Sequence, residues 1–170
     1  MRDPRELVES FGSRSGETRF ASYEALVALG PDALPALREG LRSPSWQVRR
    51  WSAISLDRLA NEEALADLVP LLTDPHPKVR LWAVHSLACD HCKDDVSCPI
   101  DVVPALSERA LEDPDVRVRR MAVIMLGSEF VDARAVPVLE RVIQVESDRK
   151  LREHAKRGLD RLGEALGPLA

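Results

Sequence analysis

The sequence predicts an all-α fold, an α-solenoid in which about five helical hairpins stack as a right-handed superhelix. The main observation is an internal repeat, because residues 43–56, 74–87 and 113–126 align without gaps. Each copy has a turn proline, an aliphatic anchor four residues later and an arginine directly after the anchor. Composition agrees, since 45% of the 170 residues are apolar but only 4% are aromatic. A single hairpin cannot bury its apolar face alone, so the stack is the folding unit.

The first helix of each hairpin is expected to begin at the turn proline. Proline cannot continue the preceding helix but is tolerated in the first turn of the next one, and an Asp or Ser beside it can cap that helix. The anchor and the apolar residues four, seven and eight positions later share one helix face. The residue four after each anchor is small, which predicts close approach of a neighbouring helix at Ser22, Ser52, Ala83, Ala122 and Ala155.

The second helix of each hairpin is expected over the apolar stretch that follows. These stretches are 33–41, 64–72, 102–111 and 135–143, with expected starts at Asp32, Asn61, Asp101 and Asp132. Pro70 lies late in its stretch and predicts a kink or an early helix end. The repeats are then 18–42, 46–72, 76–112, 115–146 and 149–166. They form one domain over residues 1–170, with 1–17 as an N-terminal cap and flexible join.

The repeated pattern resembles a known family. Asp113 to Leu126 reads Asp-Pro-x-x-x-Val-Arg-x-x-Ala-x-x-x-Leu, and the pattern returns roughly every 30 residues across about 15–165. It is similar to the short HEAT-like repeats of the phycobilisome-lyase type. The resemblance implies an armadillo-like helical solenoid that recognises a protein partner along a concave helical face. Lyase members of the family attach bilins, an alternative function that the repeat alone does not establish.

Charge and hydropathy favour a soluble, protein-binding class. The net charge of −4 disfavours a polyanion as the partner. Apolar runs such as Leu68 to Leu72 are too short to span a bilayer, and no apolar segment follows the charged N-terminus, which argues against a secretory signal. We therefore expect a cytoplasmic, monomeric protein that binds a protein partner and neither a membrane nor nucleic acid.

Catalytic patterns known from HEAT-like proteins are weak or missing. Di-iron hydroxylases use His-Glu pairs, but none of His76, His85, His91 and His154 is followed by Glu. DNA glycosylases of this fold place Trp, Asp and Arg on a basic face, an alternative that the negative net charge disfavours. No phosphate-binding glycine loop or nucleophile–base pair is visible. The sequence predicts a protein that is not an enzyme.

One arginine follows each anchor, so stacking predicts a ladder of Arg19, Arg49, Arg80, Arg119 and Arg152. Ser43, Asp74, Asp113 and Glu146 lie six residues before four of them and are expected to pair with them or to cap toward them. The ladder is therefore interpreted as a structural contact repeated at each turn. A stripe that binds phosphate or carboxylate is the alternative, and it requires guanidinium groups without partners.

The candidate partner-binding residues are aromatic and basic. Trp51 and Trp82 occupy the same position in successive repeats, followed by Met121, so stacking predicts one ridge. Partial burial in the core and an exposed protein-binding hot spot are both open for this ridge. Trp46, in a turn, is expected to be partly exposed. The repeat does not explain Arg50, Arg117 and Arg120, which are candidates for surface contacts.

The spacing of 39 residues between the second and third anchors is eight longer than the one before, and the surplus falls at 89–99. Cys89, Cys92 and Cys98 in this insertion predict one structural zinc ion, with His91 or His85 as the fourth ligand. Thiols without metal and a Cys89–Cys92 redox pair are the alternatives. Three crowded cysteines fit a reducing compartment better than a disulfide framework.

Overall fold

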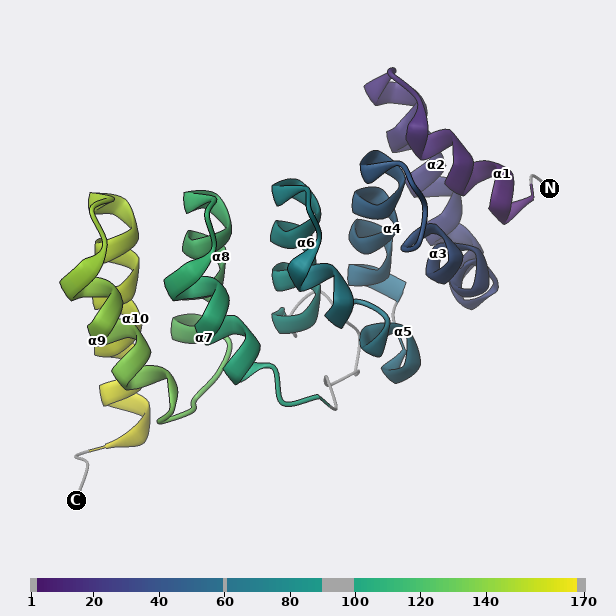
Figure 1. Cartoon of the computed structure of the whole chain (residues 1–170). Helices are drawn as coiled ribbons and strands as arrows, with labels where there is room; N and C mark the ends of the chain where they lie inside the picture. Colours follow the sequence, from purple (N-terminus) through teal and green to yellow (C-terminus); the bar gives the residue numbers. More distant parts are fainter. Residues whose placement is uncertain (1–2, 60, 90–99, 168–170) are drawn as a thin grey trace. The chain divides into compact units, whose positions relative to one another are not determined.

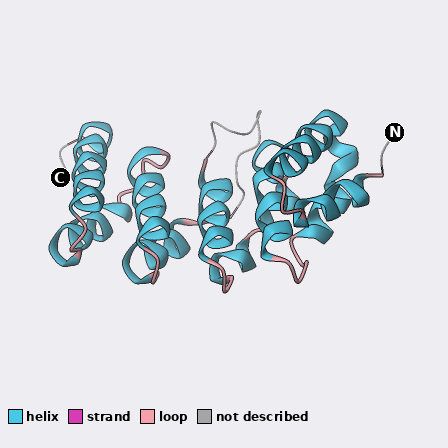
Figure 2. Ribbon diagram, turned by 90° about the horizontal axis from the view of Figure 1, so that it is seen from above, coloured by secondary structure: helices cyan, strands magenta, loops and turns pink. Residues whose placement is uncertain are grey.

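The computed structural model describes residues 3–59, 61–89 and 100–167, and all regular structure in them is helical. The chain divides into two compact units, residues 1–100 and 101–170. Figure 1 follows the helices along the chain, and Figure 2 shows that mostly short loops join them. None of the helices within the described ranges combines the length and hydropathy needed to cross a bilayer.

The first unit holds the N-terminal segment and the first repeats. In chain order its helices are α1 (Pro4–Glu9), the 3-10 helix η1 (Ser10–Gly12), α2 (Gly16–Leu29), η2 (Gly30–Ala33), α3 (Leu34–Gly40), α4 (Trp46–Leu59), α5 (Glu62–Ala66), η3 (Val69–Thr73) and α6 (Pro77–Ala88). The second unit contains α7 (Val103–Glu112), α8 (Val116–Ser128), α9 (Ala135–Val145) and α10 (Arg149–Leu166).

Helices that begin at the repeat turns pack on one another within each unit. In the first unit α2 contacts α4 and α4 contacts α6, and in the second unit α8 contacts α10. The small residues predicted to permit this are all at most 1% exposed: Ser22, Ser52, Ala83, Ala122 and Ala155. The backbones of α8 and α10 approach closely at Gly127, where an added Cβ would lie 2.6 Å from the Cα of Gly158 in α10. The predicted close packing is confirmed.

The helix caps follow the sequence only in part. The N-cap residues of α3, α7 and α9 are Ala33, Val102 and Arg134, which make no side-chain cap, so the starts predicted at Asp32, Asp101 and Asp132 lie one or two residues too early. Asn61 caps α5 as predicted, accepting from the Ala64 N–H at 2.9 Å. The acid beside the turn proline does not cap the following helix. Asp113 accepts from the N–H of Asp115 at 2.9 Å, and Asp115 is the residue that caps α8. The predicted capping acid therefore shapes the turn two residues before the true N-cap.

Pro70 was predicted to mark a kink or an early helix end, and the early end is confirmed. Helix α5 ends at Ala66, and the chain continues as the 3-10 helix η3 with Pro70 in its first turn. The ring of Pro70 cannot supply the N–H that a continuing α-helix needs.

The segment predicted as a cap and flexible join contains two helices, α1 and η1. Phe11 of η1 is fully buried, so this segment is part of the packed core.

Candidate functional site

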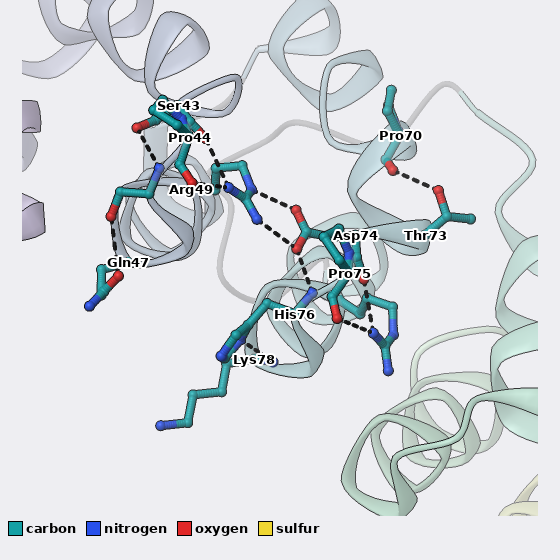
Figure 3. Close-up of polar contacts among 12 residues, drawn as sticks. Ser43, Pro44, Gln47, Arg49, Pro70, Thr73, Asp74, Pro75, His76 and Lys78 are labelled. Carbon is teal, nitrogen blue, oxygen red and sulfur yellow. Dashed lines mark hydrogen bonds and ion pairs between the residues drawn. The ribbon is translucent and has the colours of Figure 1, made fainter.

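Arg49, the arginine after an anchor, donates to carbonyl oxygens of the turn before its own helix and pairs with a carboxylate in the turn of the next repeat. Arg49 Nη1 donates to the carbonyl oxygens of Ser43 at 2.8 Å and Pro44 at 3.1 Å, and its Nε and Nη2 hold the Asp74 carboxylate at 2.6 and 3.0 Å (Figure 3). Asp74 is only 6% exposed and also accepts from the His76 N–H at 2.8 Å. One buried carboxylate thus fixes both its own turn and the preceding helix.

The same arrangement recurs in the second unit. Arg119 donates to the Asp113 carbonyl at 2.9 Å and to the Glu146 carboxylate at 2.7 Å, and this pairing lowers the pKa of Glu146. The structural interpretation of the ladder therefore holds, with one correction. The carboxylates of Asp74 and Glu146 pair with the arginine of the preceding repeat, while their backbone carbonyls accept from the arginine of their own repeat. These guanidinium groups hold the stack together.

Two of the predicted surface arginines already have carboxylate partners. Arg117 is exposed and holds Asp115 at 2.6 and 3.0 Å, which raises the pKa of Arg117. Arg120 is half-buried, and its Nη2 lies 3.1 Å from Asp148. Both are thereby committed to contacts within their own unit.

Trp46 is half-buried at the first residue of α4 and stacks on an imidazole from the following turn. The ring centroids of Trp46 and His76 are 3.9 Å apart and their planes differ by 3°. The Lys78 ammonium lies 5.3 Å from the Trp46 ring centroid. Burial, followed by the Lys78 charge, lowers the pKa of His76, so a neutral imidazole stacks on the indole at neutral pH.

The other two tryptophans each make ring contacts of their own, and the predicted ridge that joins them stays a prediction. Trp51 stacks on Phe11 with centroids 5.8 Å apart and meets Tyr23 at 6.2 Å. Trp82 makes an edge contact with His85 at 5.2 Å. No ring contact joins Trp51 to Trp82 in the described part of the chain.

We define an aromatic face on α2, α4 and α6 of the first unit. It consists of Phe20, Tyr23, Trp51, Ile54 and Trp82, each half-buried except Phe20, which is 52% exposed. Phe20 and Tyr23 are in contact at 6.0 Å, and Tyr23 contacts Trp51. Ile54 lies one helical turn after Trp51 and therefore on the same side of α4. Met121, which completes the predicted series, is half-buried on α8 in the second unit.

Arg50 borders this aromatic face and has no carboxylate partner among the described residues. Its guanidinium carbon lies 5.5 Å from the Trp51 ring centroid, and its Nε is buried without a hydrogen-bond acceptor. Burial, and then the charge of Arg19, lower the pKa of Arg50. The repeat explains the missing partner. Asp148, which pairs with the equivalent Arg120, corresponds in register to His76, which carries no negative charge to offer Arg50.

A second polar feature lies beside Trp82. Asp57 of α4 is 6% exposed, and its Oδ2 lies 3.3 Å from His85 Nε2 of α6. A buried carboxylate is tolerated when it has a hydrogen-bonding or charged partner. The pair joins α4 to α6 on the side of α6 that also carries Trp82.

The predicted zinc ligands fall mostly outside the described residues. Cys89 is buried at the end of α6, where its N–H bonds the His85 carbonyl at 2.8 Å. His91, Cys92 and Cys98 lie in 90–99, outside the described residues. Within the described ranges no group of three His, Cys, Asp or Glu side chains is placed to hold a metal ion. The zinc site stays a prediction.

A separate hollow of about 520 Å³ lies between α1, α3 and the turn before α4. Its lining includes Val8, Ala36 and Val48. At its rim, Arg5 lies 3.4 Å from Glu39. The volume suits a small ligand, but these rim charges already neutralise each other. The aromatic face with Arg50 is the stronger candidate.

Sequence reasoning found part of this face and missed part. Arg50 was found because it stands out from the repeat, and Trp51 and Trp82 because they share one position in successive repeats. Phe20 and Tyr23 were missed because the first repeat copy is weak and its register uncertain, and the Asp57–His85 pair because its residues meet only across α4 and α6. The signal that remained was the gathering of aromatic residues in the first half of the chain, which holds the sole tyrosine and all three tryptophans.

Comparison with known proteins gives a family and a fold. A family model described as HEAT repeats matches residues 4–88 and 68–160. A comparison with curated protein sequences gives no match. A solved structure from the complex of CpcE and CpcF of phycocyanin lyase from Nostoc sp. PCC7120 is similar, with 20% identity, a TM-score of 0.77 and coverage of 91% of this chain and 96% of that chain.

Two engineered solenoids are also similar. A designed armadillo repeat protein in complex with the peptide (KR)4 has 20% identity and a TM-score of 0.56, covering 93% of this chain and 81% of that chain. An engineered protein has 21% identity and a TM-score of 0.54, covering 95% and 79%. At these identities the likeness concerns the fold, and the predicted all-α solenoid class is confirmed.

Proposed function

The chain belongs to the HEAT repeat family, and from this premise we propose that it is a protein-binding scaffold whose partner docks on the aromatic face of α2, α4 and α6. The observation that carries the proposal is a cluster of half-buried aromatic side chains bordered by Arg50, a cation without a carboxylate partner among the described residues. Aromatic residues and arginine are the residue types that dominate protein-binding hot spots.

The partly covered state of the aromatic rings supports this assignment. Trp51 is braced by Phe11 and Tyr23, so its orientation is fixed before a partner arrives. Fixed side chains lose little conformational entropy on binding, which leaves more of the contact energy for affinity. A partner that covers Phe20, Tyr23 and Trp82 would remove their remaining apolar surface from water.

Arg50 indicates what the partner presents beside its apolar anchor. A half-buried guanidinium without a counter-charge is unfavourable in the unbound protein. An incoming Asp or Glu side chain restores the pairing that the repeat provides elsewhere, as between Arg120 and Asp148. A bidentate arginine–carboxylate pair in a partly dry site is among the stronger polar contacts. We expect an acidic residue next to an apolar one in the partner.

Two of the matched structures are of solenoids in complexes, one of CpcE with CpcF and one of a designed repeat protein with a peptide. These complexes support polypeptide binding as a use of the fold. The peptide (KR)4 is basic, whereas Arg50 favours an acidic ligand, so we do not expect the same ligand here.

The proposal is tested by affinity capture from an extract of the protein's own cells with three baits. The wild-type chain and Arg141→Glu, a change at an exposed residue of α9 in the other unit, should retain one defined protein. Arg50→Glu should retain it at least tenfold less, because it places a negative charge where an acidic group is expected to bind. Equal recovery by all three baits would contradict binding of the partner at the aromatic face.

A further inference from the structure

The second unit contains a small hollow between α8 and α10 with basic side chains at its edge. It measures about 180 Å³ and is lined by Ile124, Gly127, Ser128, His154, Arg157, Gly158 and Arg161. The close packing of Gly127 against Gly158 forms its floor, because neither glycine has a side chain to fill the space.

The basic groups come from one side of α10. His154, Arg157 and Arg161 follow one another at spacings of three and four residues, so they lie along one helix face. Arg161 Nη1 donates to the Gly127 carbonyl at 3.2 Å, which holds its guanidinium across the hollow. Arg157 Nη2 lies 3.0 Å from His154 Nδ1.

The contact between Arg157 and His154 fixes the imidazole's role. A guanidinium only donates, so Nδ1 of His154 accepts and Nε2 carries the proton. Burial, and then the charges of Arg157 and Arg120, lower the pKa of His154, which keeps the ring neutral at neutral pH. Two guanidinium groups and one imidazole N–H are therefore available as donors around the hollow.

The first unit shows what occupies the corresponding place there. Counted from the anchors, Asp57 of α4 corresponds to Gly127 of α8, and His85 of α6 corresponds to Arg157 of α10. In the first unit the Asp57 carboxylate and His85 pair at 3.3 Å. In the second unit the acid is replaced by glycine and the histidine by arginine, so the cation is present and, among the described residues, no carboxylate stands at the position of Asp57.

Neighbouring carboxylates do not take this place. Glu153 lies 3.3 Å from Arg149, and Asp148 pairs with Arg120 at 3.1 Å. Among the described residues no ion pair joins a carboxylate to Arg157 or Arg161. Two like charges four residues apart on a helix repel each other, and an anion bound between them removes that cost.

We propose that the hollow between α8 and α10 binds a phosphate group, with Arg157, Arg161 and His154 Nε2–H as donors. Three donors and two positive charges suit a doubly charged tetrahedral anion better than a carboxylate, which has one charge and two oxygens. The site lies in the second unit, so it is independent of the aromatic face. The phosphate comes either from a phosphorylated side chain or from the free ion.

The test is an NMR titration of the full chain with inorganic phosphate, at constant ionic strength and pH 7.5. Phosphate should shift the side-chain signals of His154, Arg157 and Arg161 in a saturable way, and acetate should not. Arg157→Gln and Arg161→Gln should each weaken phosphate binding at least tenfold. Arg149→Gln, at an exposed arginine of the same helix, should leave it within twofold.

Two further outcomes decide the proposal and the source. A phosphoserine peptide that binds tenfold more tightly than inorganic phosphate identifies a phosphorylated polypeptide as the ligand, and equal affinities identify the free ion. The phosphate site is contradicted by any of three results: no shifts in the wild type, the same shifts with acetate, or shifts that persist in both Arg157→Gln and Arg161→Gln. Each substitution changes an exposed side chain, and circular dichroism confirms that the variants are folded.

Discussion

At the scale of single residues, adjacent arginines of α4 have opposite roles. Arg49 is mostly buried and holds the buried carboxylate of Asp74. Arg50 is half-buried beside Trp51 and has no carboxylate partner among the described residues. The repeat predicted Arg49 as a structural contact and singled out Arg50 as an exception. What it could not predict was that Arg50 is half-buried, because burial depends on how the neighbouring helices pack.

We predict that Arg49→Gln and Arg50→Gln change stability in different ways. Arg49→Gln leaves the Asp74 carboxylate buried without its cation and should cost about 3 kcal/mol of unfolding free energy. Arg50→Gln removes a partly desolvated, unpaired charge and should change stability by less than about 1 kcal/mol. Urea unfolding measures both values. A large loss for Arg50→Gln would mean that Arg50 is part of the stack and not of a binding face.

The two histidines with lowered pKa predict a loss of stability in mild acid. His76 and His154 are held neutral in the folded chain mainly by burial, and in the unfolded chain they titrate near pH 6.5. Below that pH the unfolded state binds more protons, so stability falls as the pH drops from about 7.5 to 5.5. In urea unfolding across this range, His154→Asn should reduce the dependence of stability on pH. Thr73→Asn, at the exposed last residue of η3, should leave that dependence unchanged. An unchanged slope in the histidine variant would contradict the assigned shift.

At the scale of elements, the contact between α8 and α10 depends on two glycines. The sequence predicted close packing at Ala122 and Ala155 but gave no reason to single out Gly127 or Gly158. The two glycines occupy different positions in their repeats and meet only when α8 and α10 are in place. The hollow described above follows from that meeting, which is why sequence reasoning did not find it.

Gly127→Ala and Gly163→Ala should therefore have opposite effects. A Cβ at Gly127 would lie 2.6 Å from the Gly158 backbone, so the helices must separate, at a cost of about 2 kcal/mol. A Cβ at Gly163 meets nothing within 4 Å and should stabilise α10 by about 0.5 to 1 kcal/mol. Thermal unfolding followed by circular dichroism compares them. Equal shifts in melting temperature would contradict the packing described for this pair.

For the cysteine insertion, residues 89–99, the zinc prediction rests on the sequence. We propose that residues 89–99 bind one zinc ion through Cys89, Cys92 and Cys98 with His91, or His85, as the fourth ligand. Native mass spectrometry of the untagged protein should find one zinc per chain, absent from Cys92→Ser. Zinc-free wild-type protein with three titratable thiols would contradict it. His85 already lies beside Asp57, which favours His91 as the fourth ligand.

At the scale of the whole molecule, the repeat pattern predicted the helices well and the candidate site only in part. Periodicity reports which residues face a neighbouring helix, because every repeat must solve the same packing problem. Binding residues are deviations from the repeat, and a single sequence shows that Arg50 or Trp82 deviates without showing which deviations gather in space. Asp57 and His85 meet across two helices, and no local pattern in the sequence announces that contact.

Docking of a polypeptide partner on the aromatic face can be tested by site-specific photo-crosslinking. A photoreactive phenylalanine analogue is placed at Phe20, on the face, and at Ala66, an exposed residue of α5. We expect one adduct from the Phe20 position in an extract of the protein's own cells, reduced by excess wild-type chain but not by excess Arg50→Glu chain, and none from Ala66. An adduct at Ala66 of equal yield, or competition by Arg50→Glu as strong as by the wild type, would contradict the claim.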